Sequence, residues 1–311
     1  MTTKKILSIV LPVFNEEKNI AHVCEGIGQE MKKYEEKYEY EIVLVNDGSR
    51  DMSWGIISTL CDQNNHIHGI NFSRNFWQQA ALEAGLNEAH GDAVITMDAD
   101  GQHPATLIPE LVREWENGFF IVNTKRLSTQ KIHLFKKISS NIFYRLFNTL
   151  AGYRLEPASS DFRLLDRTVV DFLNTLQESP KFYRGILAWT WYKTAVVAFH
   201  AGKREGGTSG YSLQRMYELA LLGITSCSLK PLKIIILFGA FIAASASFLC
   251  CIAVYLKLVH SDYFSSSALW WSFMLANTGV IIVILGILWI YNAHIIATLH
   301  ERPTFIIKER K

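Results

Sequence analysis

The sequence has little that would place it outside a cell or on nucleic acid. Its five cysteines show neither the spacing of a disulfide framework nor that of a zinc site, which favours reduced thiols. The formal net charge is only +2, which argues against a nucleic-acid partner. The N-terminal apolar run, which ends by Val13, is too short for a signal-peptide core and has no small-residue cleavage site. We therefore expect the large N-terminal part of the chain to stay in the cytoplasm.

Charged residues are missing from two stretches in the C-terminal third, Ile234 to Leu256 and Leu269 to Ala293. Each exceeds the roughly 20 apolar residues that a helix needs to cross a bilayer. Lys and Arg flank the pair on its outer sides, whereas the loop at about 260–267 has neither, so both ends are expected in the cytoplasm. Two buried core helices are the alternative, although helices apolar on all sides are rare in soluble domains of this size. We predict two transmembrane helices, about 234–258 and 269–295, within a C-terminal part 231–311 that ends in a short cytoplasmic tail.

Residues 1–230 mix charged and apolar residues, as a soluble domain does. Short runs with strand character alternate with helical stretches, which predicts an α/β fold with a mainly parallel sheet and helices on both faces. Ligands of such folds bind outside the carboxyl ends of the strands. The expected strands are Leu7–Val13, Glu41–Val45, Ile67–Phe72, Ala93–Met97, Phe119–Asn123 and Ala195–Phe199.

Two segments of this part have the pattern of helices that lie in a membrane interface. From His133 to Leu150, leucine and isoleucine recur every four residues, with phenylalanines beside them and basic residues between. A basic amphipathic helix of this kind can bind at the lipid head groups. Packing on the sheet is the alternative, and the two apolar stretches favour the interface. Tyr211 to Leu222 is a second candidate.

Asp98 and Asp100 follow the apolar run Ala93 to Met97 and stand two residues apart. On an extended backbone such residues point to the same side, so the two carboxylates repel each other unless a cation lies between them. Oxygen ligands of this kind suit Mg²⁺ or Mn²⁺, which would also bridge to a diphosphate. Asp-x-Asp alone is more often a surface turn, but its position directly after a buried strand favours a metal site.

Five short motifs occur in order along the chain. They are Val10-Leu-Pro-Val-Phe-Asn-Glu-Glu17, Val45-Asn-Asp-Gly-Ser-Arg-Asp51, Asn75-Phe76 with Gln79-Ala-Ala-Leu82, Asp98-Ala-Asp-Gly-Gln-His-Pro104 and Ser160-Asp-Phe-Arg-Leu-Leu-Asp-Arg167. Together they resemble the family-two inverting glycosyltransferases of the GT-A nucleotide-sugar-binding fold. With Arg204, Ser209 and the two apolar stretches, they are similar to the polyprenyl-phosphate branch, which includes bactoprenol glucosyltransferases and dolichol-phosphate mannose synthases.

The resemblance implies a role for each motif residue on the donor side. Asp98 and Asp100 would hold the metal and the diphosphate, and Asp100 would also serve catalysis. Gln102 would line the sugar or metal site, and Arg126 would clamp phosphate. The residues implied at the nucleotide are Pro12, Asn15, Glu16, Asp47 and Gly48.

On the acceptor side, the resemblance gives Asp161 the position of a catalytic base. Arg163, Arg204 and Ser209 would contact the acceptor phosphate. A phosphate monoester loses its second proton near about pH 6, so it is already a nucleophile at neutral pH. Orientation of the acceptor or of the donor hydroxyls is therefore an alternative role for Asp161.

The implied activity is inverting transfer of a hexose from a nucleotide diphosphate to polyprenyl (undecaprenyl) phosphate. UDP-glucose is our first choice of donor, and transfer of mannose or an amino sugar is the alternative. The implied location is the cytoplasmic face of a bacterial inner membrane, with self-association of the chain. A processive polysaccharide synthase is disfavoured because the chain lacks Gln-x-x-Arg-Trp and further spans. A non-catalytic membrane subunit is the remaining alternative, against which the intact Asp pair argues.

Three positions depart from the family pattern. Gly101 stands where leucine is usual, Trp77 where a small residue or glycine is usual, and Gly210 where lysine is common. These departures leave the reaction class unchanged, but they leave the donor sugar open.

Overall fold

The computed structural model describes residues 4–127, 159–176, 181–200 and 303–311, together with scattered residues between 237 and 295. The predicted amphipathic segments His133–Leu150 and Tyr211–Leu222 lie outside these residues, as do Arg204, Ser209 and Gly210.

The described residues form one eight-stranded sheet with the order β7-β5-β6-β4-β1-β2-β3-β8. Strand β1 pairs in parallel with β2 and β4, β2 with β3, and β5 with β7. The antiparallel pairs are β4–β6, β5–β6 and β3–β8. The strands are β1 (Lys5–Val13), β2 (Tyr38–Asn46), β3 (Ile67–Phe72), β4 (Ala93–Thr96), β5 (Ile121–Leu127), β6 (Ser159–Asp166), β7 (Thr194–His200) and β8 (Ile307–Arg310).

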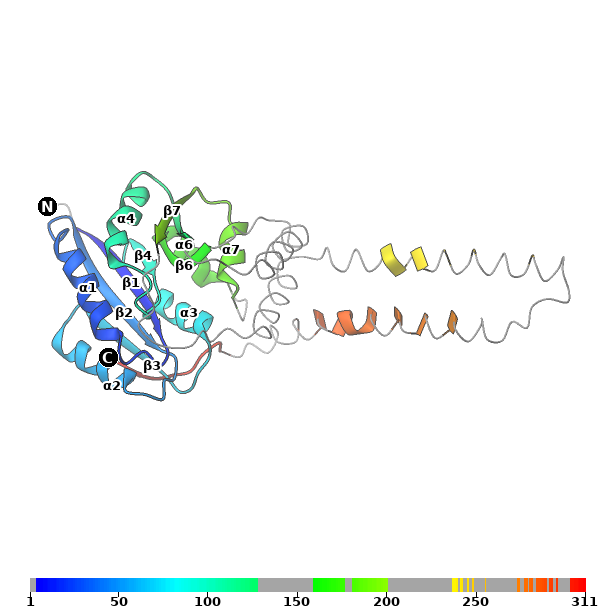
Figure 1. Ribbon diagram of the computed structural model, residues 1–311, viewed down its shortest axis with the longest axis horizontal. Coiled ribbons are helices and arrows are strands. Elements are labelled where there is room, and N and C mark those ends of the chain that lie inside the picture. The colour runs from blue at the N-terminus through cyan, green and yellow to red at the C-terminus, as the bar shows by residue number, and fades with distance from the viewer. Residues whose placement is uncertain are drawn as a thin grey trace.

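Helices cover both faces of the sheet, as predicted (Figure 1). They are α1 (Ile20–Lys32), α2 (Ser53–Gln63), α3 (Gln78–Glu88), α4 (Ile108–Glu116), α6 (Arg167–Thr175) and α7 (Tyr183–Trp189), and the short 3₁₀ helix η1 (Ala105–Leu107) precedes α4. The alternation of side chains along β1 explains the two layers, since successive residues face opposite sides of a strand. Ile9 and Leu11 pack in the cluster with α1, α2 and α4, whereas Val10 packs with α3, α6 and α7.

Helix α3 lies very close to the centre of the sheet. A Cβ atom on Gly85 would collide with the side chain of Val10, so glycine is required for this approach. The consequence for function is that the first turn of α3 is held beside the carboxyl ends of β1, β2 and β4.

The chain end forms a strand that the sequence did not predict. Strand β8 pairs with β3, and Lys311 exchanges both backbone hydrogen bonds with Gly69 at 2.8 Å. Phe305, just before β8, stacks on Phe72 with ring centroids 5.0 Å apart. The last residues therefore complete one edge of the sheet instead of forming a free tail.

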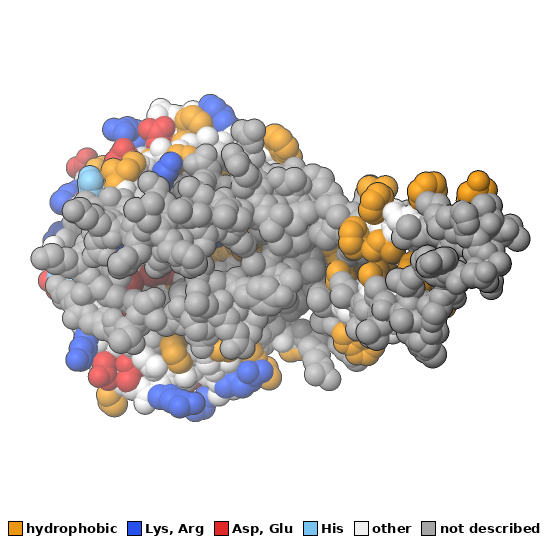
Figure 2. Space-filling view, turned by 45° about the vertical axis from the view of Figure 1, so that its right-hand side comes forward, with side chains coloured by type: hydrophobic (Ala, Val, Ile, Leu, Met, Phe, Trp, Pro, Cys, Tyr) orange, Lys and Arg blue, Asp and Glu red, His pale blue; other side chains and the backbone are white. Residues whose placement is uncertain are grey.

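Within the described residues, the structure has no helix that meets the length and apolarity needed to cross a membrane. The scattered described residues between 237 and 295 are helical, and several of their large apolar side chains are exposed, among them Phe241 and Trp289. In the space-filling view, hydrophobic side chains are visible on the part that projects from the globular region (Figure 2). A Cβ atom on Gly239 would lie 3.8 Å from Ile284 Cδ1, so the two apolar stretches contact each other at that point.

Candidate active site

The predicted donor residues gather at the carboxyl ends of β1, β2 and β4. Pro12 lies inside β1 and pairs in register with Val45, half-buried at the edge of this region. Asn15 and Glu16 follow β1, and their backbone N–H groups donate to Ser49 Oγ and Ser53 Oγ, each at 3.0 Å. The loops after β1 and β2 are thereby joined.

Asp47 is the buried acid of this group. Its Oδ1 accepts a hydrogen bond from the Phe76 N–H at 2.6 Å. Burial raises the pKa of Asp47 to about 6, although the N–H groups of Phe76 and Trp77 oppose this shift. Gly48 beside it has φ +63°, and a Cβ atom there would collide with the backbone of Arg74. The loops after β2 and β3 approach each other so closely at this point that only glycine fits.

Trp77 has a backbone conformation that favours glycine. Its φ is +76°, which is strained for a bulky residue, and its side chain is exposed. The next residue, Gln78, opens α3 and donates from Nε2 to Asp98 Oδ1 at 2.7 Å. Backbone strain of this kind is typical of functional sites.

Asp98 and Asp100 lie close together directly after β4, as their spacing predicts. Burial, reinforced by the negative charges of Asp161 and Asp100, raises the pKa of Asp98 to about 7. Asp100 Oδ1 accepts from the Gln102 N–H at 3.0 Å, and Gly101 between them has φ +75°. The loop therefore concentrates negative charge at the end of the sheet.

This surplus of negative charge fits a divalent cation. Among the described residues, no group of three or more His, Cys, Asp or Glu side chains is arranged to hold a metal ion. Two carboxylates with mutual repulsion can still bind one, because Mg²⁺ and similar ions take their remaining ligands from water and substrate phosphates. The donor set is thus suitable for a cation that is shared with a bound diphosphate.

His103 connects this loop to β6. Its Nδ1 accepts from the Asp98 N–H at 2.9 Å, and its Nε2 lies 3.0 Å from Ser160 Oγ. Burial lowers the pKa of His103 to about 4, so the ring is neutral and its proton is on Nε2. Phe162 stacks on the ring at 5.0 Å. His103 thereby fixes the position of Asp98 relative to Asp161.

Asp161 is held by two arginines. Arg184 on α7 binds it through Nε at 2.9 Å and Nη2 at 2.8 Å, and Arg163 Nη2 lies 2.8 Å from Oδ1. Burial opposes ionisation, but the two guanidinium groups outweigh it and hold the pKa of Asp161 well below its usual range. A carboxylate in this state is a weak proton acceptor, so the geometry favours an orienting role over that of a base.

The other predicted arginines differ in their positions. Arg163 is buried and also donates to the Ser160 carbonyl oxygen at 3.1 Å. Arg126, on β5, is exposed and donates to Gln102 Oε1 at 2.9 Å, which brings these two predicted residues together. Arg184 and Gln78 were not predicted, because neither belongs to a motif with the acid that it contacts. Each reaches its partner, Asp161 or Asp98, from a helix distant in the sequence.

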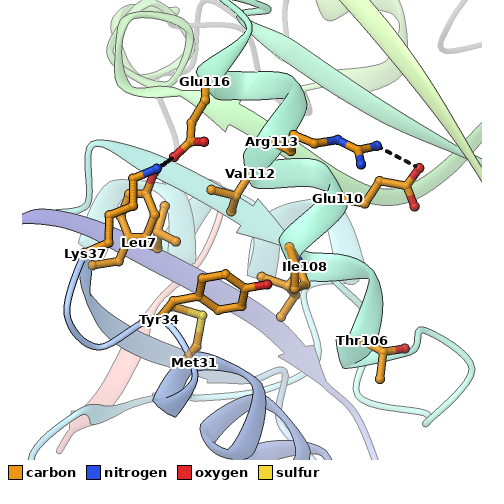
Figure 3. A pocket seen from close by; sticks show the side chains of 12 residues that line it. Leu7, Met31, Tyr34, Lys37, Thr106, Ile108, Glu110, Val112, Arg113 and Glu116 are labelled. Atoms are coloured by element: carbon orange, nitrogen blue, oxygen red, sulfur yellow. Dashed lines mark hydrogen bonds and ion pairs between the residues drawn. The ribbon is translucent and has the colours of Figure 1, made fainter.

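A cavity of about 510 Å³ lies at the opposite end of the sheet, between α1, α4 and the start of β2. Its charged groups pair with one another, since Lys37 contacts Glu116 and Arg113 lies 3.6 Å from Glu110 (Figure 3). The pairing leaves no excess of positive charge for a phosphate. None of the residues that line this cavity belongs to the acidic site, so the two are separate.

A mainly parallel sheet with helices on both faces and an acidic loop beyond the carboxyl end of β4 defines an α/β domain with its ligand site at that end. The chain belongs to the family described as glycosyl transferase family 2, whose sequence pattern matches residues 8–173. It is thus a glycosyltransferase.

Its relatives include "Uncharacterized glycosyltransferase YkcC" of Bacillus subtilis, 33% identical over 97% of this chain and 93% of that protein. "Bactoprenol glucosyl transferase" of Shigella phage SfX is 35% identical over 98% of this chain and 99% of that protein. Among solved structures, "Crystal Structure of a Mycobacterial Protein" matches with a TM-score of 0.50 and 16% identity, over 71% of this chain and 73% of that one. This last likeness concerns the fold alone.

Proposed function

We propose that this enzyme transfers a hexose, glucose from UDP-glucose as the first choice, to a polyprenyl phosphate with inversion at the anomeric carbon. The observation that carries the proposal is the match, over almost the full length of both chains, to a protein named bactoprenol glucosyl transferase. The site supports it, because its acids and arginines suit a diphosphate donor and a phosphate acceptor.

The donor nucleotide is assigned to the loops after β1 and β2. The base lies against Asp47 and Gly48, and Pro12, Asn15 and Glu16 form the edge of its pocket. Asp47 accepts from an N–H of the base, in which case the bound nucleotide favours its ionised form. The diphosphate then extends toward Asp98, Asp100 and Gln102, with Arg126 beside Gln102.

Asp98 and Asp100 are the residues assigned to Mg²⁺ or Mn²⁺. When bound there, a divalent cation neutralises the negative charge that develops on the leaving diphosphate. Gln78 and His103 hold Asp98 from two sides. They keep its carboxylate aimed at the donor while the glycosidic bond breaks.

The acceptor phosphate needs no strong base. Its oxygen is already negatively charged near neutral pH and attacks the anomeric carbon directly. Asp161, fixed by Arg163 and Arg184, orients the acceptor or the sugar hydroxyls. Orientation of this kind can lower the barrier by several kcal/mol, on the order of the gain from intramolecular geometry.

A membrane position completes the proposal. Residues 1–230 form the cytoplasmic catalytic domain, and 231–311 carry two membrane-spanning helices at about 234–258 and 269–295. The exposed apolar side chains of the described residues in these stretches support this division. An enzyme at the inner membrane surface meets a lipid phosphate at high effective concentration.

The test is one incubation of the purified full chain with labelled undecaprenyl phosphate and a panel of nucleotide sugars. We expect a labelled glycolipid with UDP-glucose and a divalent cation, and none after addition of a chelator. Faster transfer from GDP-mannose or from a UDP-amino sugar would change the assigned donor sugar but not the reaction class. No transfer from any donor would refute the proposed transfer to a polyprenyl phosphate.

A further inference from the structure

Helix α7 brings a charged residue to the active site from outside the family-matched segment 8–173. Arg184, in its first turn, binds both carboxylate oxygens of Asp161. Arg184 is thus part of the reaction centre.

Arg184 and Arg163 are differently accessible. The side chain of Arg163 is 5% exposed and that of Arg184 is 39% exposed. An anion that enters the site can therefore reach the guanidinium group of Arg184 but not the buried one of Arg163. A guanidinium has five N–H donors in a planar fork, so it can serve a carboxylate and a phosphate together.

A buried ion pair fixes the start of α7. Lys181 Nζ lies 2.9 Å from Glu83 Oε1 on α3 and donates to the Leu173 carbonyl oxygen at 3.1 Å. Lys181 and Glu83 are both almost fully buried, and such a pair is strongly destabilised when one partner is removed. The helix that carries Arg184 is therefore fastened to the helix that carries Gln78.

The far end of α7 exposes two tryptophans. Trp189 is 60% and Trp191 is 84% exposed, and Trp191 has the strained φ of +58°. Tryptophan is enriched where a protein meets the membrane interface. Helix α7 also lies on the side of the domain from which the described helical residues 237–295 extend (Figure 1). Arg184 and Trp189 are five residues apart, which is about 7 to 8 Å along a helix.

We propose that α7 forms the acceptor side of the active site, with Arg184 binding the phosphate of the lipid and Trp191 lying at the bilayer interface. This inference rests on the proposed function and names the residues that recognise its acceptor. The donor diphosphate is assigned to β1, β2 and β4, and Asp161 on β6 lies between those strands and Arg184. In this arrangement, the donor diphosphate and the acceptor phosphate lie on opposite sides of Asp161.

The test compares Michaelis constants for the two substrates in the full-length Arg184→Gln variant. We expect the KM for undecaprenyl phosphate to rise about 10- to 100-fold, as expected for loss of a charge-assisted hydrogen bond. The KM for the nucleotide sugar should change less than about twofold. Arg184→Lys keeps a charge beside Asp161 and should show the same selective rise, smaller in size. Arg113→Gln, at an exposed arginine on α4, is the matched control and should leave both constants unchanged.

A second experiment distinguishes recognition of the phosphate from recognition of the lipid chain. Geranyl phosphate, which carries only two isoprene units, should lose affinity in Arg184→Gln as undecaprenyl phosphate does. Trp191→Asn, which tolerates a positive φ, should raise the KM only for the long lipid in vesicles.

Three results would overturn the inference. They are an equal rise in both KM values in the Arg184 variants, a fall in kcat alone, and an unchanged KM for the long lipid in Trp191→Asn. The first two mean that Arg184 only holds Asp161. If wild-type enzyme transfers sugar while these variants behave in that way, the proposed function stands and only the role of α7 fails. If wild-type enzyme transfers nothing, the function itself fails.

Discussion

Two arginines bind the single carboxylate of Asp161, and this favours an orienting role in catalysis over that of a base. Replacing it with asparagine removes one charge and leaves Arg163 buried without its partner. We expect Asp161→Asn to lower kcat by the same factor at every pH between about 5 and 9, because orientation does not depend on proton transfer. The measurement is a pH profile of kcat for both proteins. If the acid limb of the wild-type profile disappears in the variant, Asp161 is a base after all.

The ion pairs of Asp161 with Arg163 and Arg184 should also affect the stability of the fold. The folded-state pKa of Asp161 is depressed, so its contribution is present above the unfolded value of about 3.9 and is lost as pH falls below it. Removing one partner of a buried pair costs about 3 to 5 kcal/mol. Thermal melts should therefore show a large loss for Asp161→Asn at pH 7 and a smaller one at pH 3. Equal losses at both values would contradict the assignment.

For Asp47, we predict that ionisation lowers the stability of the fold, the opposite of its effect at Asp161. Its folded pKa, about 6, is raised above the unfolded value of about 3.9, so stability falls as pH rises through this range. Asp47→Asn cannot ionise, and its stability relative to wild type should rise by about 2 to 2.5 kcal/mol between pH 4 and pH 8 without nucleotide. Melting curves at the two pH values test this, with the exposed Asp171→Asn as control. The variant should also bind UDP more weakly, because the neutral amide oxygen of asparagine is a weaker acceptor than a carboxylate.

Candidate site residues were found where they form a short motif at the end of a strand. Residues that reach the site from a helix distant in the sequence were not found. Asp98 and Asp100 follow a buried strand at the spacing of a metal site, and Asp47-Gly48 ends another strand. Gln78 and Arg184 reach the same site from α3 and α7, and no spacing in the sequence indicates that those helices meet there. Trp77 was flagged only as a departure, and its positive φ supplies the reason.

At the scale of elements, the strands buried on both faces were predicted best. The β1 and β3 runs were placed within a few residues, because apolar runs bounded by turn residues are typical of central parallel strands. Strand β6 was missed because it carries Asp161 and Arg163, whose charges are satisfied only by each other and by α7. Strand β8 was missed because Ile307 to Arg310 is mostly polar and is stabilised by pairing with β3.

Strand β8 should contribute measurably to the stability of the catalytic domain. Ending the chain at Pro303 removes the two bonds between Gly69 and Lys311, the bond from Ser73 N–H to the Ile306 carbonyl oxygen, and the Phe305 stack. At about 1 kcal/mol for each hydrogen bond, we expect a loss of about 3 kcal/mol or more. In a domain of this size that lowers Tm by about 6 to 12 °C. Lys311→Gln is the control, because its ion pair with Asp62 is solvent-exposed and should contribute little. An unchanged Tm after truncation would mean that β3 is stable as an edge strand.

For the whole molecule, the pairing of β8 with β3 restricts how the chain can cross a membrane. Strands β1 to β7 precede the apolar stretches and β8 follows them, yet all eight belong to one sheet. The segment between them must therefore leave and re-enter the same side, so any crossings occur in pairs. The flanking Lys and Arg residues predict the same hairpin from charge alone. We expect Ser265→Cys, in the connecting loop, to react with a membrane-impermeant maleimide in intact cells. Glu36→Cys, on the catalytic domain, should react only after lysis. Labelling of both positions in intact cells, or of neither, would contradict a two-helix hairpin with a cytoplasmic catalytic domain.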